Sequence, residues 1–177
     1  MEFGSDYLIF IVRWLHVLSG VMWVGLLWYF NFVQTPSMAK IADEHKPAVT
    51  KHIAPEALFW FRWSALSTVI FGVLVAWMEG YLGAGLLLGM TEGANAVPSG
   101  VAGAATIGFG MWFGLIMAFN VWFIIWPNQK KILGIVEATD EEKGKAKRIA
   151  FLASRSNTLM SIPVLLFMQA GGHGMPF

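Results

Sequence analysis

Four long apolar runs constrain the fold of this 177-residue chain more than any other feature. A helix needs about 20 mostly apolar residues to cross a bilayer. Segments of that kind occupy residues 7–32, 58–78, 107–126 and 150–169. Charged residues make up only 13% of the chain, roughly half of the share that soluble domains usually carry. The sequence therefore predicts an all-α fold, an integral membrane four-helix bundle that forms a single transmembrane domain over residues 1–177.

The distribution of Lys and Arg predicts how this bundle is oriented. Nine of the twelve basic residues lie in two connections, 33–55 and 127–149. None lies before the first span, in the connection 80–106 or after the last span. Because short loops rich in Lys and Arg stay in the cytoplasm, we expect the two basic connections to be cytoplasmic and both termini to be periplasmic. The main expected partner is the lipid bilayer, and the family resemblance described below implies the bacterial inner (plasma) membrane.

Composition also excludes several classes of function. The formal net charge of +1 indicates no polyanionic partner such as nucleic acid. The chain has no cysteine, which excludes disulfides, thiolate metal sites, cysteine nucleophiles and covalent c-type haem attachment. A small and strongly apolar chain of this kind also fits an association with other membrane redox subunits or with a second copy of itself.

The connection after the second span is itself apolar and rich in glycine from Gly80 to Met90. We expect it to lie on the membrane surface or to form a short interfacial or re-entrant element. Irregular backbone at membrane depth is tolerated only where it is buried in protein or lines a cavity. Residues 91–100 are more typical of turns.

The first span carries polar residues where a membrane helix normally has none. At about 100° per residue, the side chains of Arg13, His16, Gly20 and Trp23 share one narrow stripe of the helix. A charge near the bilayer centre costs at least about 2.5–3.5 kcal/mol on insertion scales, so this stripe should face the other helices. His16 is therefore a candidate axial ligand for a b-type haem (haem b). The alternative is a buried histidine that is hydrogen-bonded to a neighbouring helix.

In the haem hypothesis the other residues of the stripe have separate tasks. Gly20 would let the flat macrocycle approach the helix. Trp23 would form a wall of the pocket, and Arg13 would bind the propionates.

The second axial ligand of such a haem is left open by the sequence. His173, which glycines flank on both sides, could fold back, and Met168 or Met111 could serve instead. His173 is also a candidate ligand for copper or zinc, and the alternative is an exposed tail.

A second group of polar residues lies within roughly two helical turns of the predicted cytoplasmic face. It comprises Arg62, Arg155 and Asn157, with Asn120 on the third span. The functional hypothesis is a site for an anion: haem propionates, a carboxylate substrate or a lipid headgroup, with which Arg forms bidentate pairs. The structural alternative is arginines that reach the headgroups, together with hydrogen bonds between helices.

Five segments resemble the membrane domain at the N-terminus of bacterial membrane-bound urate oxidases. They are Arg13–Gly25, Trp28–Pro36, Asn120–Trp122 with Pro127–Lys130, and Ser154–Pro163. The urate-oxidising members of that family also carry a C-terminal cytochrome c domain, whose cysteines are absent here. The resemblance therefore implies a helical membrane domain without autonomous urate oxidation.

A looser likeness is confined to the first span. The pattern His-x-x-x-Gly-x-x-Trp-x-Gly, formed here by His16, Gly20, Trp23 and Gly25, resembles the first helix of HemJ-type protoporphyrinogen oxidases. In those proteins a first-helix histidine is taken to bind haem, and the likeness implies the same role for His16.

These observations lead to one main hypothesis and two alternatives. The main hypothesis is a small membrane protein that binds b-type haem and transfers electrons or supports an oxidoreductase. One alternative is a non-catalytic accessory subunit of a larger membrane complex. The other is a transporter or channel for a small anion, in which the arginines within the spans would line the path.

Overall fold

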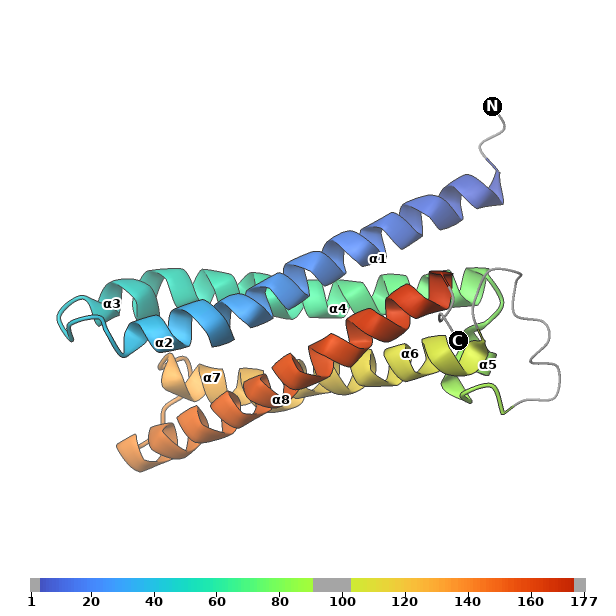
Figure 1. Cartoon of the computed structure of the whole chain (residues 1–177). Coiled ribbons are helices and arrows are strands. Elements are labelled where there is room, and N and C mark those ends of the chain that lie inside the picture. The colour runs from blue at the N-terminus through green and yellow to red at the C-terminus, as the bar shows by residue number, and fades with distance from the viewer. Residues whose placement is uncertain (1–3, 91–102, 174–177) are drawn as a thin grey trace. The chain divides into compact units, whose positions relative to one another are not determined.

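The computed structural model describes residues 4–90 and 103–173, without the side chains of Ala104 and of residues 171–173. This part of the chain is helical and contains no strand. The α-helices are labelled in Figure 1, and the elements given below as η are π-helical. In chain order they are α1 (Ser5–Trp28), η1 (Tyr29–Gln34), α2 (Thr35–Met38), α3 (Lys46–Ala48), η2 (Val49–Ile53), α4 (Ala54–Met78), α5 (Leu82–Leu86), α6 (Ala104–Phe119), η4 (Asn120–Ile125), α7 (Trp126–Ile132) and α8 (Asp140–His173).

Within the described residues, 4 helical stretches are long and apolar enough to cross a membrane. They are Ser5–Met38, Lys46–Met78, Ala105–Ile132 and Asp140–Ala170, and each contains one of the predicted apolar spans. The prediction of an all-α chain with four candidate membrane helices is thereby confirmed. The side of the membrane on which the termini lie stays a prediction.

Each π-helical turn named above ends two residues before a proline. These prolines are Pro36 after η1, Pro55 after η2 and Pro127 after η4. Inside a helix, a proline ring clashes with the carbonyl group four residues earlier and removes an N–H donor. In all three cases that carbonyl lies within the π-turn, where the wider backbone relieves the clash. Pro163 lies inside α8 without such a turn.

The chain divides into two compact units. The first comprises Met1–Leu18, Ser67–Met117 and Met160–Phe177, and the second comprises Ser19–Leu66 and Ala118–Leu159. Each of the four long helical stretches contributes a segment to each unit. The single transmembrane domain expected from the sequence stays a prediction.

The first unit contains an apolar cluster and a close approach of two backbones. Its buried centre and the residues packed around it are Ala76, Tyr81 and Ile107, with Leu82, Met111 and Met168. The glycine-rich connection contains the short helix α5, which lies against α6: a Cβ at Gly108 would collide with the carbonyl oxygen of Gly85. The indole Nε1 of Trp112 also donates a hydrogen bond of 2.9 Å to the carbonyl oxygen of Leu86. Residues 91–100 lie outside the described part of the chain.

The second unit has polar as well as apolar residues in its interior. Leu27 and Phe61 are almost completely buried, and Phe30 packs edge-to-face on Phe61 with 5.6 Å between the ring centroids. The amide side chains of Asn31 and Asn157 are buried in the same unit. Its interior is therefore held by hydrogen bonds in addition to apolar packing.

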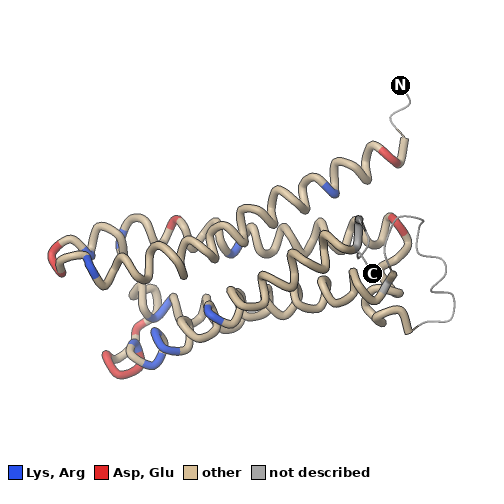
Figure 2. The backbone as a smooth tube through the Cα atoms, viewed as in Figure 1, with Lys and Arg blue, Asp and Glu red and all other residues tan. Residues whose placement is uncertain are grey.

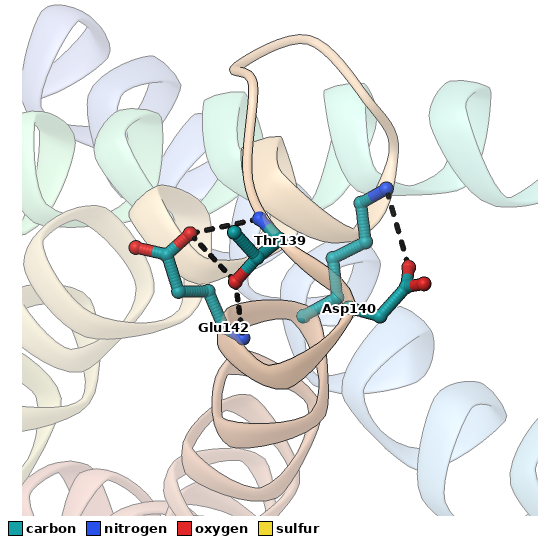
Figure 3. A network of polar contacts seen from close by, with 4 residues as sticks. Thr139, Asp140 and Glu142 are labelled. Carbon is teal, nitrogen blue, oxygen red and sulfur yellow. Dashed lines mark hydrogen bonds and ion pairs between the residues drawn. The ribbon is translucent and has the colours of Figure 1, made fainter.

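A capping box, shown in Figure 3, begins α8 in the second unit. The backbone N–H of Thr139 donates to Oε2 of Glu142 at 2.8 Å, and the N–H of Glu142 donates to Oγ1 of Thr139 at 3.3 Å. Asp140 and Lys143 lie 4.0 Å apart across the same turn. The hydrogen bond from the Thr139 backbone holds the pKa of the Glu142 carboxyl below its ordinary value. Both partners thus satisfy N–H groups that the first turn leaves free.

Charge is distributed unequally between the units. The second has eleven basic and seven acidic residues, a formal charge of +4, whereas the first has one basic and four acidic residues, a formal charge of −3. Within the second unit, Figure 2 shows Lys and Arg concentrated around the connections that precede α4 and α8. These are the connections that the sequence predicts to be cytoplasmic.

Candidate functional site

His16 lies on α1 and contacts α4 within the first unit. Its ring atom Nδ1 is 2.8 Å from the backbone carbonyl oxygen of Thr68. A carbonyl oxygen can only accept a hydrogen bond, so Nδ1 must carry the proton. The lone pair of the neutral ring is then on Nε2, which has no hydrogen-bond partner among the described residues. This hydrogen bond thus determines the tautomer and the nitrogen that is available as a ligand.

Gly72, one turn after Thr68 on α4, makes room for the imidazole. A Cβ at this position would lie 2.8 Å from Cε1 and 2.9 Å from Nδ1 of His16. A larger residue would push the ring away from the Thr68 carbonyl. Sequence analysis missed both α4 residues, because a lone glycine is common in membrane helices and the pairing of α1 with α4 depends on tertiary structure.

Arg13, one turn before His16, forms an ion pair with Glu79, which follows the end of α4. Glu79 was not among the predicted site residues. The pair neutralises the charge that we expected to face haem propionates. Nearby, burial and the charge of Glu79 raise the pKa of the Tyr81 phenol. Tyr81 therefore stays protonated, and it can donate a hydrogen bond at physiological pH.

The candidates for a second axial ligand are placed differently from one another. Met111 and Met168 both pack against the apolar cluster of the first unit. Ala76 of this cluster lies one turn after Gly72 on α4. The cluster therefore follows the His16 contact by one turn along that helix. His173 is the last residue of α8, and its side chain is outside the described ones.

The remaining residues of the predicted stripe, Gly20 and Trp23, belong to the second unit. Trp23 is buried, as expected for a stripe that faces other helices. Its indole Nε1 has no hydrogen-bond partner among the described residues, and neither do Nε1 of Trp122 and Oε1 of Gln34 in the same unit. Unpaired buried polar atoms are costly and indicate places where a water or another bound group is expected.

Asparagines connect the helices of the second unit. Nδ2 of Asn31 donates to the carbonyl oxygen of Leu27 at 2.9 Å and to Oγ of Ser154 at 2.8 Å. One turn further along α8, Oδ1 of Asn157 accepts a hydrogen bond of 2.8 Å from Asn120. Asn157 therefore has the interhelical role that was the structural alternative to an anion site.

Arg62 packs against an indole ring in the second unit. Its Cζ atom is 3.5 Å from the centroid of the Trp126 ring, and Nη1 donates to the carbonyl oxygen of Leu58 at 3.2 Å. Arg155 is exposed, with Cζ 5.1 Å from the ring of Phe151. Among the described residues no hydrogen bond or ion pair joins Arg62 or Arg155 to Asn157. The three residues predicted as one anion site thus have separate partners.

A conventional metal site is not evident in the part of the chain that the structure describes. No group of three or more His, Cys, Asp or Glu residues there could hold a metal ion. A haem needs only one or two axial ligands from the protein. The absence of such a group among the described residues therefore does not bear on the role predicted for His16.

The fold defines a helical protein with four helices suited to crossing a membrane. The model of the family described as urate oxidase N-terminal matches residues 99–177, so this part of the chain is similar to that family. The resemblance predicted from the sequence is confirmed for these residues, which include Asn120–Trp122 and Ser154–Pro163. No curated protein and no solved structure matches the chain. The likeness to HemJ-type proteins lies in the first span, outside the matched residues.

Proposed function

We propose that this chain is a multi-pass protein of the bacterial inner membrane that binds a b-type haem through His16. Its function would be to transfer electrons or to support an oxidoreductase. The four candidate spans and the similarity to the urate oxidase N-terminal family support a membrane role. The observation that carries the haem assignment is the hydrogen bond from His16 Nδ1 to Thr68.

The donor chemistry of this site fits a haem. Histidines that bind metals usually donate their other ring N–H to a carboxylate or a backbone carbonyl, which fixes the ring and its tautomer. The Thr68 carbonyl has that role for His16, so Nε2 would be the axial ligand. A bound haem would supply one-electron chemistry, and His16 would hold it and tune its potential. Met168 or Met111 would supply a second ligand from the same unit.

Optical spectroscopy of the purified protein tests this proposal. Protein prepared from haem-replete cells should have a Soret band, with α and β bands on reduction, and His16→Ala should lose them. His45→Ala is the matched control, because His45 is exposed outside the predicted spans. A colourless wild-type protein, or an unchanged spectrum in His16→Ala, would refute the assignment.

Gly72→Ala provides a second test of the same geometry. The added methyl would displace the imidazole from Thr68, so the haem should bind more weakly or have a shifted reduction potential. Gly114→Ala is its control, because a Cβ there meets nothing within 4 Å. An identical potential and haem content in wild type and Gly72→Ala would contradict the positioning role.

We also propose the orientation predicted by the basic connections, with 33–55 and 127–149 in the cytoplasm. The excess positive charge of the second unit supports it. Because the chain has no cysteine, single cysteines introduced at Lys143 and at Ser5 give an unambiguous readout. In intact spheroplasts, a membrane-impermeant maleimide should label Ser5→Cys and leave Lys143→Cys unlabelled. The reverse pattern would overturn the orientation.

A further inference from the structure

Arg62 is a cation inside a predicted span. Among the described residues, no carboxylate forms an ion pair with it. The ion pairs of Lys and Arg in that part of the chain are Arg13–Glu79, Lys46–Asp43, Lys143–Asp140 and Lys145–Glu141. An arginine within a predicted span is unfavourable unless its guanidinium group has an anionic partner or reaches the lipid headgroups. This requirement favours an anion bound from outside the chain.

The contact with Trp126 prepares the guanidinium for such an anion. All five N–H donors of an arginine lie in the plane of its guanidinium group. Trp126 covers this group, with Cζ only 3.5 Å from the ring centroid, and Leu58 accepts a hydrogen bond from Nη1. Both contacts restrict the side chain of Arg62, yet among the described residues only Leu58 accepts a hydrogen bond from it. The remaining donors form a planar fork that matches the oxygens of a phosphate group.

The surroundings of Arg62 also favour an anion. Lys130 follows Trp126 by one turn of α7, which places both on the same face of that helix. The unit that contains them has a formal charge of +4. Arg62 lies only four residues into the span that begins at residue 58, so it is close to the depth at which lipid headgroups are expected.

From this geometry we infer that Arg62, held against Trp126 and assisted by Lys130, binds the phosphate group of an anionic phospholipid. Free phosphate has the same chemistry, but the position near the end of a span favours a lipid. The inference does not depend on haem binding, since it concerns residues of the second unit only.

Lipid binding to the purified protein tests this site. The detergent-solubilised protein is titrated with dioleoylphosphatidylglycerol or with dioleoylphosphatidylcholine, and bound lipids are counted by native mass spectrometry. Wild type should retain phosphatidylglycerol in preference to phosphatidylcholine, and Arg62→Gln should weaken the tightest phosphatidylglycerol site at least tenfold. Arg155→Gln is the matched control, because Arg155 is exposed and its Cζ lies 5.1 Å from the centroid of the Phe151 ring. It should change this affinity less than twofold.

Arg62→Lys tests whether binding depends on the planar set of guanidinium donors or only on the positive charge. This variant keeps the charge, and it should nevertheless lose most of the affinity for phosphatidylglycerol. Inorganic phosphate, titrated by calorimetry, distinguishes the two sources. Binding of phosphate, but not of phosphatidylglycerol, in an Arg62-dependent way would retain the site and assign it to the free ion. Equal binding of both lipids to wild type, or unchanged affinity in Arg62→Gln or Arg62→Lys, would overturn the inference.

Discussion

The two units of this protein place polar groups in a membrane environment by different means. In the first, polar side chains act in isolated pairs, His16 with the Thr68 carbonyl and Arg13 with Glu79, beside an apolar cluster. In the second, amide side chains of the π-turns η1 and η4 donate hydrogen bonds to side chains of α8. The pair of His16 and Thr68 leaves Nε2 of the imidazole available. The asparagine amides of the second unit instead use most of their donors in hydrogen bonds. The first unit therefore offers a lone pair on a ring nitrogen, whereas the second unit offers the N–H donors of Arg62.

Two asparagines of the second unit contact the backbone in or next to a π-turn. A π-turn shifts backbone hydrogen bonds by one residue and leaves a carbonyl without its usual donor. The side chain of Asn31, in η1, donates to the Leu27 carbonyl, and that of Asn128, just after η4, donates to the Ile124 carbonyl at 2.7 Å. In both cases the amide gives a backbone carbonyl four residues earlier a side-chain donor.

Gly108→Ala should have the largest effect and would break the packing of the first unit. The new methyl would collide with the backbone of Gly85, which cannot move aside as a side chain can. We expect a loss of about 3 kcal/mol in the free energy of unfolding, the upper end of the usual cost of overpacking. Equilibrium unfolding in mixed micelles measures it. In the control, Gly114→Ala, stability should stay the same or rise slightly. Equal stability of the two variants would show that α5 and α6 do not approach this closely.

Asn157→Leu should have the next largest effect and tests the polar interior of the second unit. It removes the acceptor for Asn120 and leaves a half-buried amide unpaired. The expected loss is about 1–3 kcal/mol. The double variant Asn120→Leu/Asn157→Leu should recover part of this loss, because neither donor nor acceptor then remains. Strictly additive losses, measured by the same unfolding assay, would contradict the coupling.

Thr139→Ala should have a smaller effect, limited to the aqueous end of the second unit. The substitution removes the hydroxyl that caps α8 and should cost about 1 kcal/mol. Thr139→Ser, which keeps the hydroxyl, should stay close to wild type. Hydrogen exchange at the first turn of α8 would localise the effect. Equal exchange in the two variants would mean that the cap contributes nothing.

The pH dependence of the same cap should be the smallest effect. The pKa of Glu142 is lowered in the folded chain by the hydrogen bond from the Thr139 backbone. Its contribution to stability is therefore complete above the ordinary value of 4.5, and it is lost as the pH falls through the lowered pKa. Thermal unfolding of wild type should show a drop in this acid range that is reduced in Glu142→Gln. The same drop in both proteins would assign it to other carboxyl groups.

The amino-acid sequence by itself determined the class of fold. Long apolar runs leave a helix as the only way to satisfy the backbone within a bilayer, so the spans could be located from hydrophobicity alone. The π-turns could not be located in the same way, because Pro36, Pro55 and Pro127 each follow one whereas Pro163 lies inside α8 without one. The inward position of Trp23 was also predictable, because helical periodicity places it on a stripe with polar residues.

Only the tertiary structure decided which partners the polar residues have. Thr68, Gly72 and Glu79 lie far from His16 and Arg13 in the sequence, and they meet these residues through the register between α1 and α4. Such a register results from the packing of many apolar side chains, which periodicity cannot provide. For the same reason Arg62, Arg155 and Asn157 are predicted as one site but have separate partners. Their depth in the membrane is a property of the sequence, whereas the direction in which each side chain points depends on its neighbours.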